Sequence, residues 1–363
     1  MTNIDQQSIN TIRVLAADVV QKANSGHPGA PLGTAPMMYE LYGHGLMHNP
    51  KNPNWENRDR FILSGGHGSA GLYALLHLFG YNISMDDLKN FRQLGSITPG
   101  HPEFGHTCAV ECTTGPLGSG LSAGVGMAMA EQFLGAHFNR PGYPIVDHFT
   151  FVEVGDGDLM EGISEEALSL AGTLKLNKLI VLYDSNNISI EGDTDMVFAE
   201  DVNKRMEALG FQTWTVDGND VDGIRKAIEE AKADQEKPSF ITVKTKIGYG
   251  SPKEGSASSH GEPLGVDNVK ALKRNLGWNE ESTFDVPQEV YAHFQELAKN
   301  GQAQEAAWNE LYAQYKEAYP ELEAEYVKML TQTPNQADLE AADLWNVSDK
   351  AEATRVSSGK MLN

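Results

Sequence analysis

Two polar motifs in the middle of the chain could together bind a metal ion with a diphosphate. Gly-Asp-Gly occupies residues 155–157, and Asn-Asn-Ile-Ser-Ile occupies residues 186–190. The carboxylate of Asp156, the amide oxygen of Asn186 and a loop carbonyl suit a hard cation such as Mg²⁺ or Ca²⁺. The two glycines leave the backbone bare beside the carboxylate, so a phosphate group can approach as closely as the metal. The pattern predicts a site for a metal-bound diphosphate.

The elements around these motifs predict that their polar side chains converge. Residues 149–154 and 179–183 have the composition of buried strands, and residues 164–174 between them have helical periodicity. Asp156 and Asn186 then follow the ends of neighbouring parallel strands. Ligands collect at the carboxyl ends of such strands, so the two side chains are expected to face one ion.

A second anion site is predicted nearer the N-terminus. A short apolar strand over residues 60–63 runs into the glycine-rich turn at residues 64–69, and an apolar helix follows up to Phe79. A strand, a glycine-rich loop and a helix in this order direct unpaired N–H groups and the helix dipole at the turn.

The rest of the chain continues the alternation of strands and helices. A helix is expected over residues 9–23, and residues 211–216, 221–233 and 239–244 read as strand, helix and strand. The predicted fold class is therefore α/β, a doubly wound, mostly parallel sheet with helices on both faces. The small residues of 121–132 permit close helix packing, but they follow a polar turn and so do not indicate a dinucleotide site.

Four histidines recur in settings that could form one cleft. Three lie in turns flanked by Gly or Pro, and the fourth lies in the Gly/Ser-rich loop 246–265; they are His27, His67, His101 and His260. Each alone could be a surface or capping residue. Together they could donate hydrogen bonds to phosphate and sugar hydroxyls and transfer protons.

Composition excludes some classes of function. The chain has 28 basic and 50 acidic residues, a net charge of −22, which opposes nonspecific binding of nucleic acid. No long apolar run occurs, and the first ten residues lack the features of a signal peptide, so neither export nor membrane insertion is predicted and a cytoplasmic location is expected. The two cysteines, Cys108 and Cys112, are expected to be reduced.

Six stretches of the sequence resemble the transketolase family, in the same order and over essentially the whole chain. They are SGHPGAPLG, RDRFILSGGHGS, FRQLGSITPGHPE, TTGPLGSG, VGDGDLMEGISEEALSLAGTLKLNKLIVLYDSNNISI and SHGEPLG. The resemblance implies the thiamine-diphosphate-binding fold and reversible transfer of a two-carbon ketol unit in the pentose phosphate pathway, from a ketose phosphate such as xylulose 5-phosphate to an aldose phosphate such as ribose 5-phosphate. The closely related dihydroxyacetone synthase is an alternative.

The resemblance also implies roles for individual residues. The metal, Mg²⁺ or Ca²⁺, would be held by Asp156, Asn186 and the carbonyl of Ile188. Thiamine diphosphate would contact those two side chains and also His67, Gly115, Leu117, Gly157 and Ile190. The substrate channel would contain His27, His101 and His260, with Arg355 on the sugar phosphate. Without the resemblance, Glu161 and Glu166 read as ordinary acids at a helix start; with it, they resemble the carboxylates that link two active sites across a homodimer interface.

Five positions depart from the family pattern. Gly65 occupies a position where the family commonly has Asn, and Cys112 one where it has Thr. Gly95 and Glu165 occupy positions where histidine is frequent. Glu153 places an acid in the buried strand before the Gly-Asp-Gly turn. An unpaired buried carboxylate is costly, so Glu153 is expected to find a partner or to have a raised pKa.

The chain has about half the length of a transketolase. We expect residues 1–331 to form the diphosphate-binding domain with a helical extension, and 332–363 to be a linker and the start of a pyrimidine-binding domain supplied by the other half. The isolated chain is then expected to bind metal and cofactor but to lack ketol transfer. Alternatives are the N-terminal subunit of a split enzyme and a noncatalytic thiamine-diphosphate- or metal-binding module.

Overall fold

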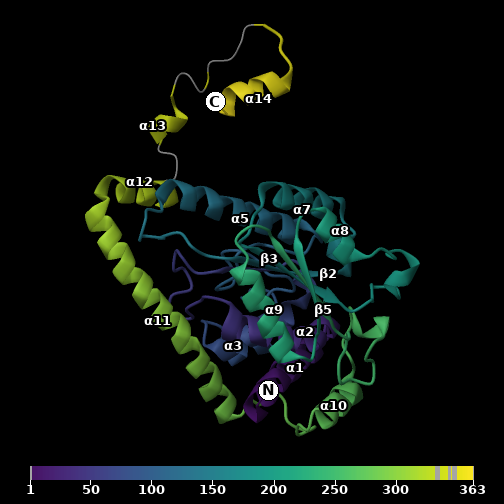
Figure 1. Cartoon of the computed structure of the whole chain (residues 1–363). Helices are drawn as coiled ribbons and strands as arrows, with labels where there is room; N and C mark the ends of the chain where they lie inside the picture. The colour runs from purple at the N-terminus through teal and green to yellow at the C-terminus, as the bar shows by residue number, and fades with distance from the viewer. Residues whose placement is uncertain (1, 332–335, 342–344, 346–349, 363) are drawn as a thin grey trace. The chain divides into compact units, whose positions relative to one another are not determined.

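The computed structural model describes residues 2–331, 336–341, 345 and 350–362 (Figure 1). The chain divides into two compact units, Met1–Leu311 and Tyr312–Asn363. The α-helices of the first unit are α1 (Asn3–Ala23), α2 (Gly29–Glu40), α3 (Ser69–Phe79), α4 (Met85–Lys89), α5 (Ser119–Phe138), α6 (Asp156–Leu159), α7 (Gly162–Leu174), α8 (Val202–Ala208), α9 (Val221–Ala233), α10 (Val266–Asn275) and most of α11 (Gln288–Ala318).

A five-stranded parallel sheet forms the centre of the first unit. Its strands are β1 (Arg60–Leu63), β2 (Thr150–Gly155), β3 (Leu179–Ser185), β4 (Gln212–Asp217) and β5 (Ser239–Lys244), and their spatial order is β1-β2-β3-β5-β4. All four strand pairings are parallel. The predicted α/β class and the adjacency of β2 and β3 are confirmed.

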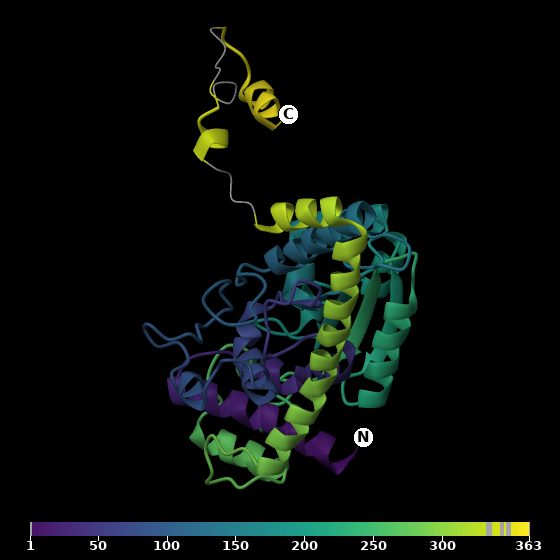
Figure 2. The same ribbon diagram turned by 90° about the vertical axis from the view of Figure 1, so that its left-hand side faces the viewer.

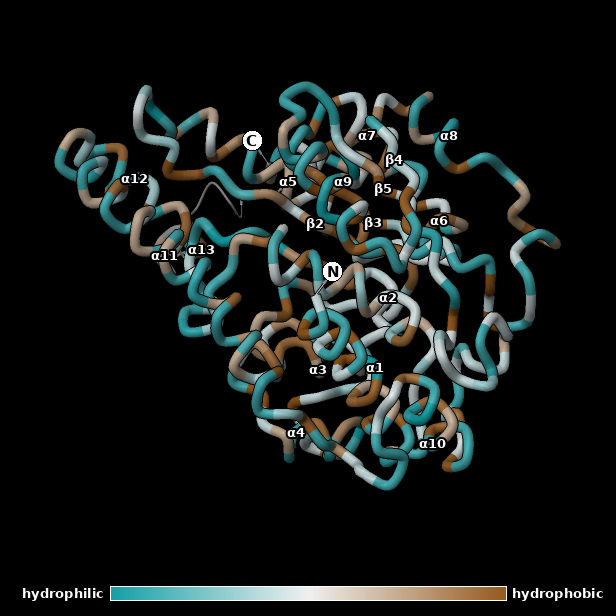
Figure 3. Tube along the Cα trace, turned by 60° about the horizontal axis from the view of Figure 1, so that its bottom comes forward, coloured by the Kyte–Doolittle hydropathy of each residue, from teal (hydrophilic) through white to brown (hydrophobic). Residues whose placement is uncertain are grey.

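Helices cover both faces of the sheet because strand residues alternate between two hydrophobic cores. Phe151, Ile180 and Leu182 pack with α1, α2, α3, α9 and the start of α11 on one face. Val152 and Val181 pack with α5, α7 and α8 on the other. Figure 3 shows the hydrophobic residues in brown along these strands. The sheet is thus doubly wound, as predicted.

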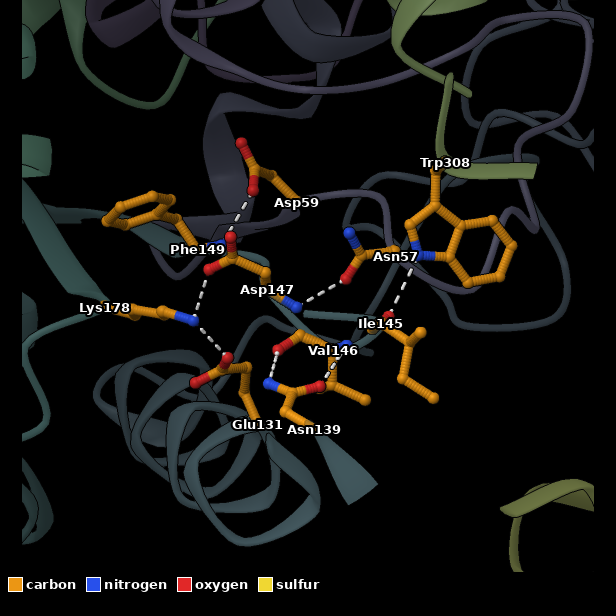
Figure 4. A network of polar contacts seen from close by, with 10 residues as sticks. All are labelled: Asn57, Asp59, Glu131, Asn139, Ile145, Val146, Asp147, Phe149, Lys178 and Trp308. Carbon is orange, nitrogen blue, oxygen red and sulfur yellow. Dashed lines mark hydrogen bonds and ion pairs between the residues drawn. The ribbon is translucent and has the colours of Figure 1, made fainter. Parts of the chain in front are cut away.

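The segment that leads into β2 is fixed by a polar network at the amino ends of the strands (Figure 4). Lys178 Nζ lies 2.5 Å from Glu131 Oε1 and 2.6 Å from Asp147 Oδ1. Asp59 Oδ1 accepts a hydrogen bond of 2.7 Å from the backbone N–H of Phe149. These contacts join the segment before β2 to the residues that precede β1 and β3.

Helix α11 is 31 residues long and begins against the first core. Val290 and Phe294 are fully buried there, and the indole N–H of Trp308 donates to the carbonyl of Ile145 at 2.9 Å. Figure 2 shows this long yellow-green helix from the side. This helix lies in the part of the chain where a helical extension was expected.

Each predicted strand and helix is present, with ends that differ by a few residues, but α2, α4, α8 and α10 were not predicted. α9 has the predicted bounds, and α1 ends at Ala23, directly before Asn24, which adopts a left-handed conformation with φ 49°. α2 was not predicted, because it is buried on nearly every side and has Pro36 within it, so it shows no amphipathic periodicity. Loop 246–265 contains only a 3₁₀ turn at Ala257–Ser259 and otherwise lacks helices and strands.

The second unit contains the end of α11, α12 (Pro320–Thr331), α13 (Gln336–Leu339) and α14 (Thr354–Leu362). The carboxylate of Glu323 accepts from Tyr312 at 3.2 Å and from Lys316 at 3.0 Å. Much of the predicted linker, residues 332–335, 342–344 and 346–349, lies outside the described residues. Within the described part of the chain, no helix combines the length and the apolar character needed to cross a membrane.

Candidate active site

The candidate site lies where three adjacent strands end. The register pairs Leu63 of β1 with Glu153 of β2, and Gly155 of β2 with Asp184 of β3. The glycine-rich turn after β1, the Gly-Asp-Gly turn and the Asn186 loop therefore meet at one edge of the sheet. They surround a cavity of about 340 Å³, lined by His27, Ala30, Gly65, His67, His101, Gly115, Leu117, Glu153, Gly155, Asp156, Gly157, Asp158, Asp184, Asn186, Ile188, Ser189, Ile190, Glu191 and His260.

Asp156 is buried and has one carboxylate oxygen to offer a ligand. Its Oδ1 accepts a short hydrogen bond from the Tyr183 hydroxyl. Its Oδ2 has no hydrogen-bond partner among the described residues. Burial raises the pKa of this carboxyl, although the Tyr183 hydrogen bond opposes the shift. A buried oxygen without a partner at a cavity wall fits a hard cation.

The loop after β3 presents the second predicted ligand. Asn187 adopts a left-handed conformation with φ 62°, which turns the chain sharply beside Asn186. The Asn186 amide is oriented on both sides, because its nitrogen donates to Asp184 Oδ2 at 2.8 Å and its oxygen accepts from the Ile188 N–H at 3.0 Å. Since the amide is held in place, its oxygen stays at the cavity wall together with Asp156 and Ile188.

Two glycines allow the loops to approach the cavity closely. A Cβ atom on Gly157 would lie 2.9 Å from Leu117 Cδ1, so a side chain there would collide with the neighbouring loop. Gly115 has a φ of 144°, which side chains rarely tolerate, and lies against the ring of His101. The turn at 113–120 can therefore lie directly over the Gly-Asp-Gly turn.

The four predicted histidines form one cluster. The ring centroids of His27 and His67 are 5.2 Å apart, and those of His67 and His260 are 5.1 Å apart. His27 also lies 6.2 Å from His101 and 5.7 Å from His260. His27 and His260 are 233 positions apart in the sequence, yet the fold places all four imidazoles at one cavity.

The cluster keeps its imidazoles neutral near physiological pH. Burial, together with the other rings of the cluster, lowers the pKa of His67 to about 3. Burial, His260, Arg92 and His101 together lower the pKa of His27 to about 4. Burial also lowers the pKa of His101 and His260. Neutral imidazoles can donate or accept hydrogen bonds at carbonyl and hydroxyl oxygens without adding a second charge to the site.

Carboxyl groups also line the cavity. Glu153 is 5% exposed, and its Oε2 has no hydrogen-bond partner among the described residues. Burial, followed by Asp184 and Asp158, raises its pKa well above 4.5, as expected for an unpaired buried acid. Burial likewise raises the pKa of Asp184 to about 7, with Asp156 adding to the shift. A divalent cation would offset this concentration of negative charge.

Asp158 is a site residue that sequence reasoning missed. It is fully buried, and its Oδ1 accepts from the Ser64 hydroxyl at 2.6 Å and from the Gly118 N–H at 2.8 Å. Its Oδ2 accepts from the Gly155 N–H at 3.0 Å. Asp158 therefore ties together the turn after β1, the turn at 113–120 and the Gly-Asp-Gly turn. Its place directly after Gly-Asp-Gly was the only signal in the sequence.

Three predicted site residues lie outside the cavity. Glu161 and Glu166 are exposed at the start of α7, where an interface role would place them. Arg355 is exposed on α14 of the second unit. The roles of these three stay predictions.

The structure shows the surroundings of the other positions that depart from the family pattern. Glu165 forms an ion pair with Arg205 on α8. Gly95 has a φ of 79°, so a histidine would be strained at that position. A Cβ atom on Gly65 would lie 3.5 Å from Glu153 Oε2, which places these two departures next to each other. Cys108 and Cys112 are free cysteines.

Comparison with known proteins identifies the family. Residues 4–334 match the family model described as "Transketolase, thiamine diphosphate binding domain". The transketolase of Halalkalibacterium halodurans is 55% identical over 99% of this chain and 54% of its own length. That of Bacillus subtilis is 50% identical over 100% of this chain and 55% of its own.

Solved structures of transketolases also superpose on this chain. Transketolase from Leishmania mexicana superposes with a TM-score of 0.92 at 47% identity, over 100% of this chain and 54% of that one. Transketolase from Pichia stipitis, in complex with sedoheptulose-7-phosphate, superposes with a TM-score of 0.93 at 46% identity, over 99% of this chain and 54% of that one. The chain spans about half the length of these relatives. It belongs to the transketolase family, and it contains the thiamine-diphosphate-binding domain of that family.

Proposed function

We propose that this chain binds the diphosphate and metal of thiamine diphosphate for a transketolase reaction. The reaction is transfer of a two-carbon ketol unit from a ketose phosphate such as xylulose 5-phosphate to an aldose phosphate such as ribose 5-phosphate. The observation that carries the proposal is the single cavity that combines the partnerless Asp156 oxygen with four neutral imidazoles. Bound thiamine diphosphate would supply the nucleophilic carbon for the carbonyl chemistry.

Different residues of the cavity would bind the metal and the diphosphate, contact the rest of the cofactor and orient the substrate. Asp156, Asn186 and the Ile188 carbonyl would hold Mg²⁺ or Ca²⁺, and the bare backbone of Gly157 with His67 would contact the diphosphate. Gly115, Leu117 and Ile190 would lie against the organic part of the cofactor. His27, His101 and His260 would orient substrate oxygens, and imidazoles of this cluster would relay protons, which neutral imidazoles can do at pH 7.

Calorimetry tests the binding half of the proposal. Titration of the 363-residue chain with thiamine diphosphate should give binding that requires Mg²⁺ or Ca²⁺. Asp156→Ala should weaken it at least tenfold, because a charged metal ligand is lost. Asp147→Ala, which removes an exposed carboxylate at the other end of β2, should leave binding unchanged. Binding that survives both EDTA and Asp156→Ala would contradict the metal site.

We further propose that a pyrimidine-binding half completes the active site. The support is that relatives are about twice as long as this chain. The chain mixed with a separately produced second half should transfer ketol units, and the chain alone should not. Cofactor binding without transfer in the mixture would instead favour a noncatalytic module. Arg355 would contact the sugar phosphate, for which a guanidinium is suited.

A homodimer is the proposed assembly. The adjacent helices α5 and α7 and the turn between α6 and α7 expose several large apolar side chains beside Glu161 and Glu166: Met129, Phe133, Met160, Ile163, Leu170 and Leu174. Exposed apolar residues concentrated on neighbouring elements favour a protein–protein interface. The two glutamates would lie within it.

A further inference from the structure

Arg92 contacts a histidine of the cluster from outside the cavity. Its Nη2 lies 3.3 Å from His27 Nδ1, and its Nη1 donates to the Ser25 hydroxyl at 2.9 Å. A guanidinium has only donors and keeps its proton in proteins. His27 Nδ1 must therefore accept the hydrogen bond, so the proton of the neutral ring resides on Nε2.

The backbone holds Arg92 in this place against its conformational preference. Arg92 has a φ of 60°, in the left-handed region that few residues other than glycine occupy. Its N–H donates to the Thr98 carbonyl at 3.0 Å. A Cβ atom on Gly100 would lie 2.7 Å from Arg92 Nε, so a side chain at position 100 would displace the guanidinium from this place. An unfavourable backbone conformation at a site often accompanies a functional constraint.

The other nitrogen of His27 faces Gly261, next to His260. A Cβ atom on Gly261 would lie 3.4 Å from His27 Nε2, and the His27 ring meets that of His260 edge-on. The titratable groups around the His27 ring are Arg92, His67, His101 and His260. Burial and the charge of Arg92 both oppose protonation of this ring.

We propose that Arg92 is a positioning residue that fixes His27 as its Nε2-protonated tautomer, so that His27 acts as a permanent hydrogen-bond donor to a substrate oxygen and never as a base. The part that concerns substrate rests on the proposed function. The tautomer itself is a property of the chain alone. It also divides labour within the cluster, because proton abstraction then falls to the other imidazoles.

Nitrogen NMR of the 363-residue chain labelled with ¹⁵N-histidine tests this assignment. The signals of His27 are those lost in His27→Asn. The wild-type chain should show a protonated Nε2 and an unprotonated Nδ1 throughout the neutral pH range. Arg92→Met keeps a long side chain on the same left-handed backbone but removes the hydrogen-bond donors of the guanidinium. In this variant the two shifts should move toward each other, because both tautomers become populated.

Two further variants keep the test decisive. In Arg92→Asn, the asparagine suits the left-handed backbone and is too short to reach His27. This variant should therefore change the tautomer as Arg92→Met does, and it serves as the test if Arg92→Met folds poorly. Ser25→Ala removes the other partner of Arg92 and should leave the His27 shifts as in the wild type. A protonated Nδ1 in the wild type would overturn the proposal. So would wild-type shifts in folded Arg92→Met and Arg92→Asn. Failure of cofactor binding would not overturn it, because the NMR measurement is made without cofactor or substrate.

Discussion

The hydroxyl oxygen of Ser64 lies 2.6 Å from Oδ1 of Asp158, a residue 94 positions later in the chain. Ser64 also accepts from the backbone N–H of Leu121 at 3.0 Å. The pair thus joins the turn after β1, the start of α5 and the Gly-Asp-Gly turn. The geometry of the proposed diphosphate site depends on this buried connection.

Asp158→Asn should destabilise the chain. The amide nitrogen would replace one carboxylate oxygen and face either the Gly155 N–H or the pair of donors from Ser64 and Gly118. Leaving buried donors unpaired costs about 1–3 kcal/mol, which urea unfolding would show as a lower midpoint. The matched control Asp147→Asn changes a carboxylate that is 53% exposed and should cost less than about 1 kcal/mol. Equal effects of the two substitutions would show that the connection at Asp158 is unimportant.

Glu153→Gln should stabilise the metal-free chain at high pH. The pKa of Glu153 is raised in the fold, so the unfolded chain releases this proton first, at pH values from about 4.5 upward. Over that window the unfolded state binds fewer protons than the folded state, and stability falls as pH rises toward the folded pKa. Glutamine has no proton to release and removes this loss.

Urea unfolding at pH 5 and pH 8, in EDTA, would measure the effect of Glu153→Gln. The gain at pH 8 should exceed that at pH 5 by about 1 kcal/mol or more, since each unit of pKa displacement is worth about 1.4 kcal/mol. The exposed Glu229→Gln should show no such difference. A gain that is the same at both pH values would mean that ionisation of Glu153 is not responsible.

The sequence predicted the parts of the site whose signals are local. Asp156 and Asn186 follow directly on apolar strands, and the histidine turns are marked by neighbouring Gly and Pro. Arg92 and Asp158 could not be predicted in the same way, because their importance depends on partners 65 and 94 residues away and on a left-handed backbone. The α2 helix was not predicted for a physical reason as well, because a helix buried on nearly all sides has no polar face to reveal its periodicity.

Ile163→Glu should weaken self-association of the chain. Ile163 is 48% exposed on α7, and a charge there would be buried without a partner if α5 and α7 form the dimer contact. Sedimentation velocity at micromolar concentration should show a dimer for the wild type and more monomer for the variant. Val266→Glu, on α10, is the control because Val266 is an exposed apolar residue on another surface. A wild-type monomer, or an unchanged dimer in Ile163→Glu, would argue against this interface.

Two glycine-to-alanine substitutions in helices should have effects of opposite sign. Alanine is favoured over glycine within a helix by about 1 kcal/mol, so Gly126→Ala in α5, where a Cβ atom would meet nothing within 4 Å, should raise the urea midpoint. In α7 a Cβ atom on Gly172 would lie 1.7 Å from the carbonyl oxygen of Leu209. The backbone after α8 would have to move, so Gly172→Ala should lower the midpoint despite the better helix propensity. If both variants were stabilised, the close approach of α7 to Leu209 would be wrong.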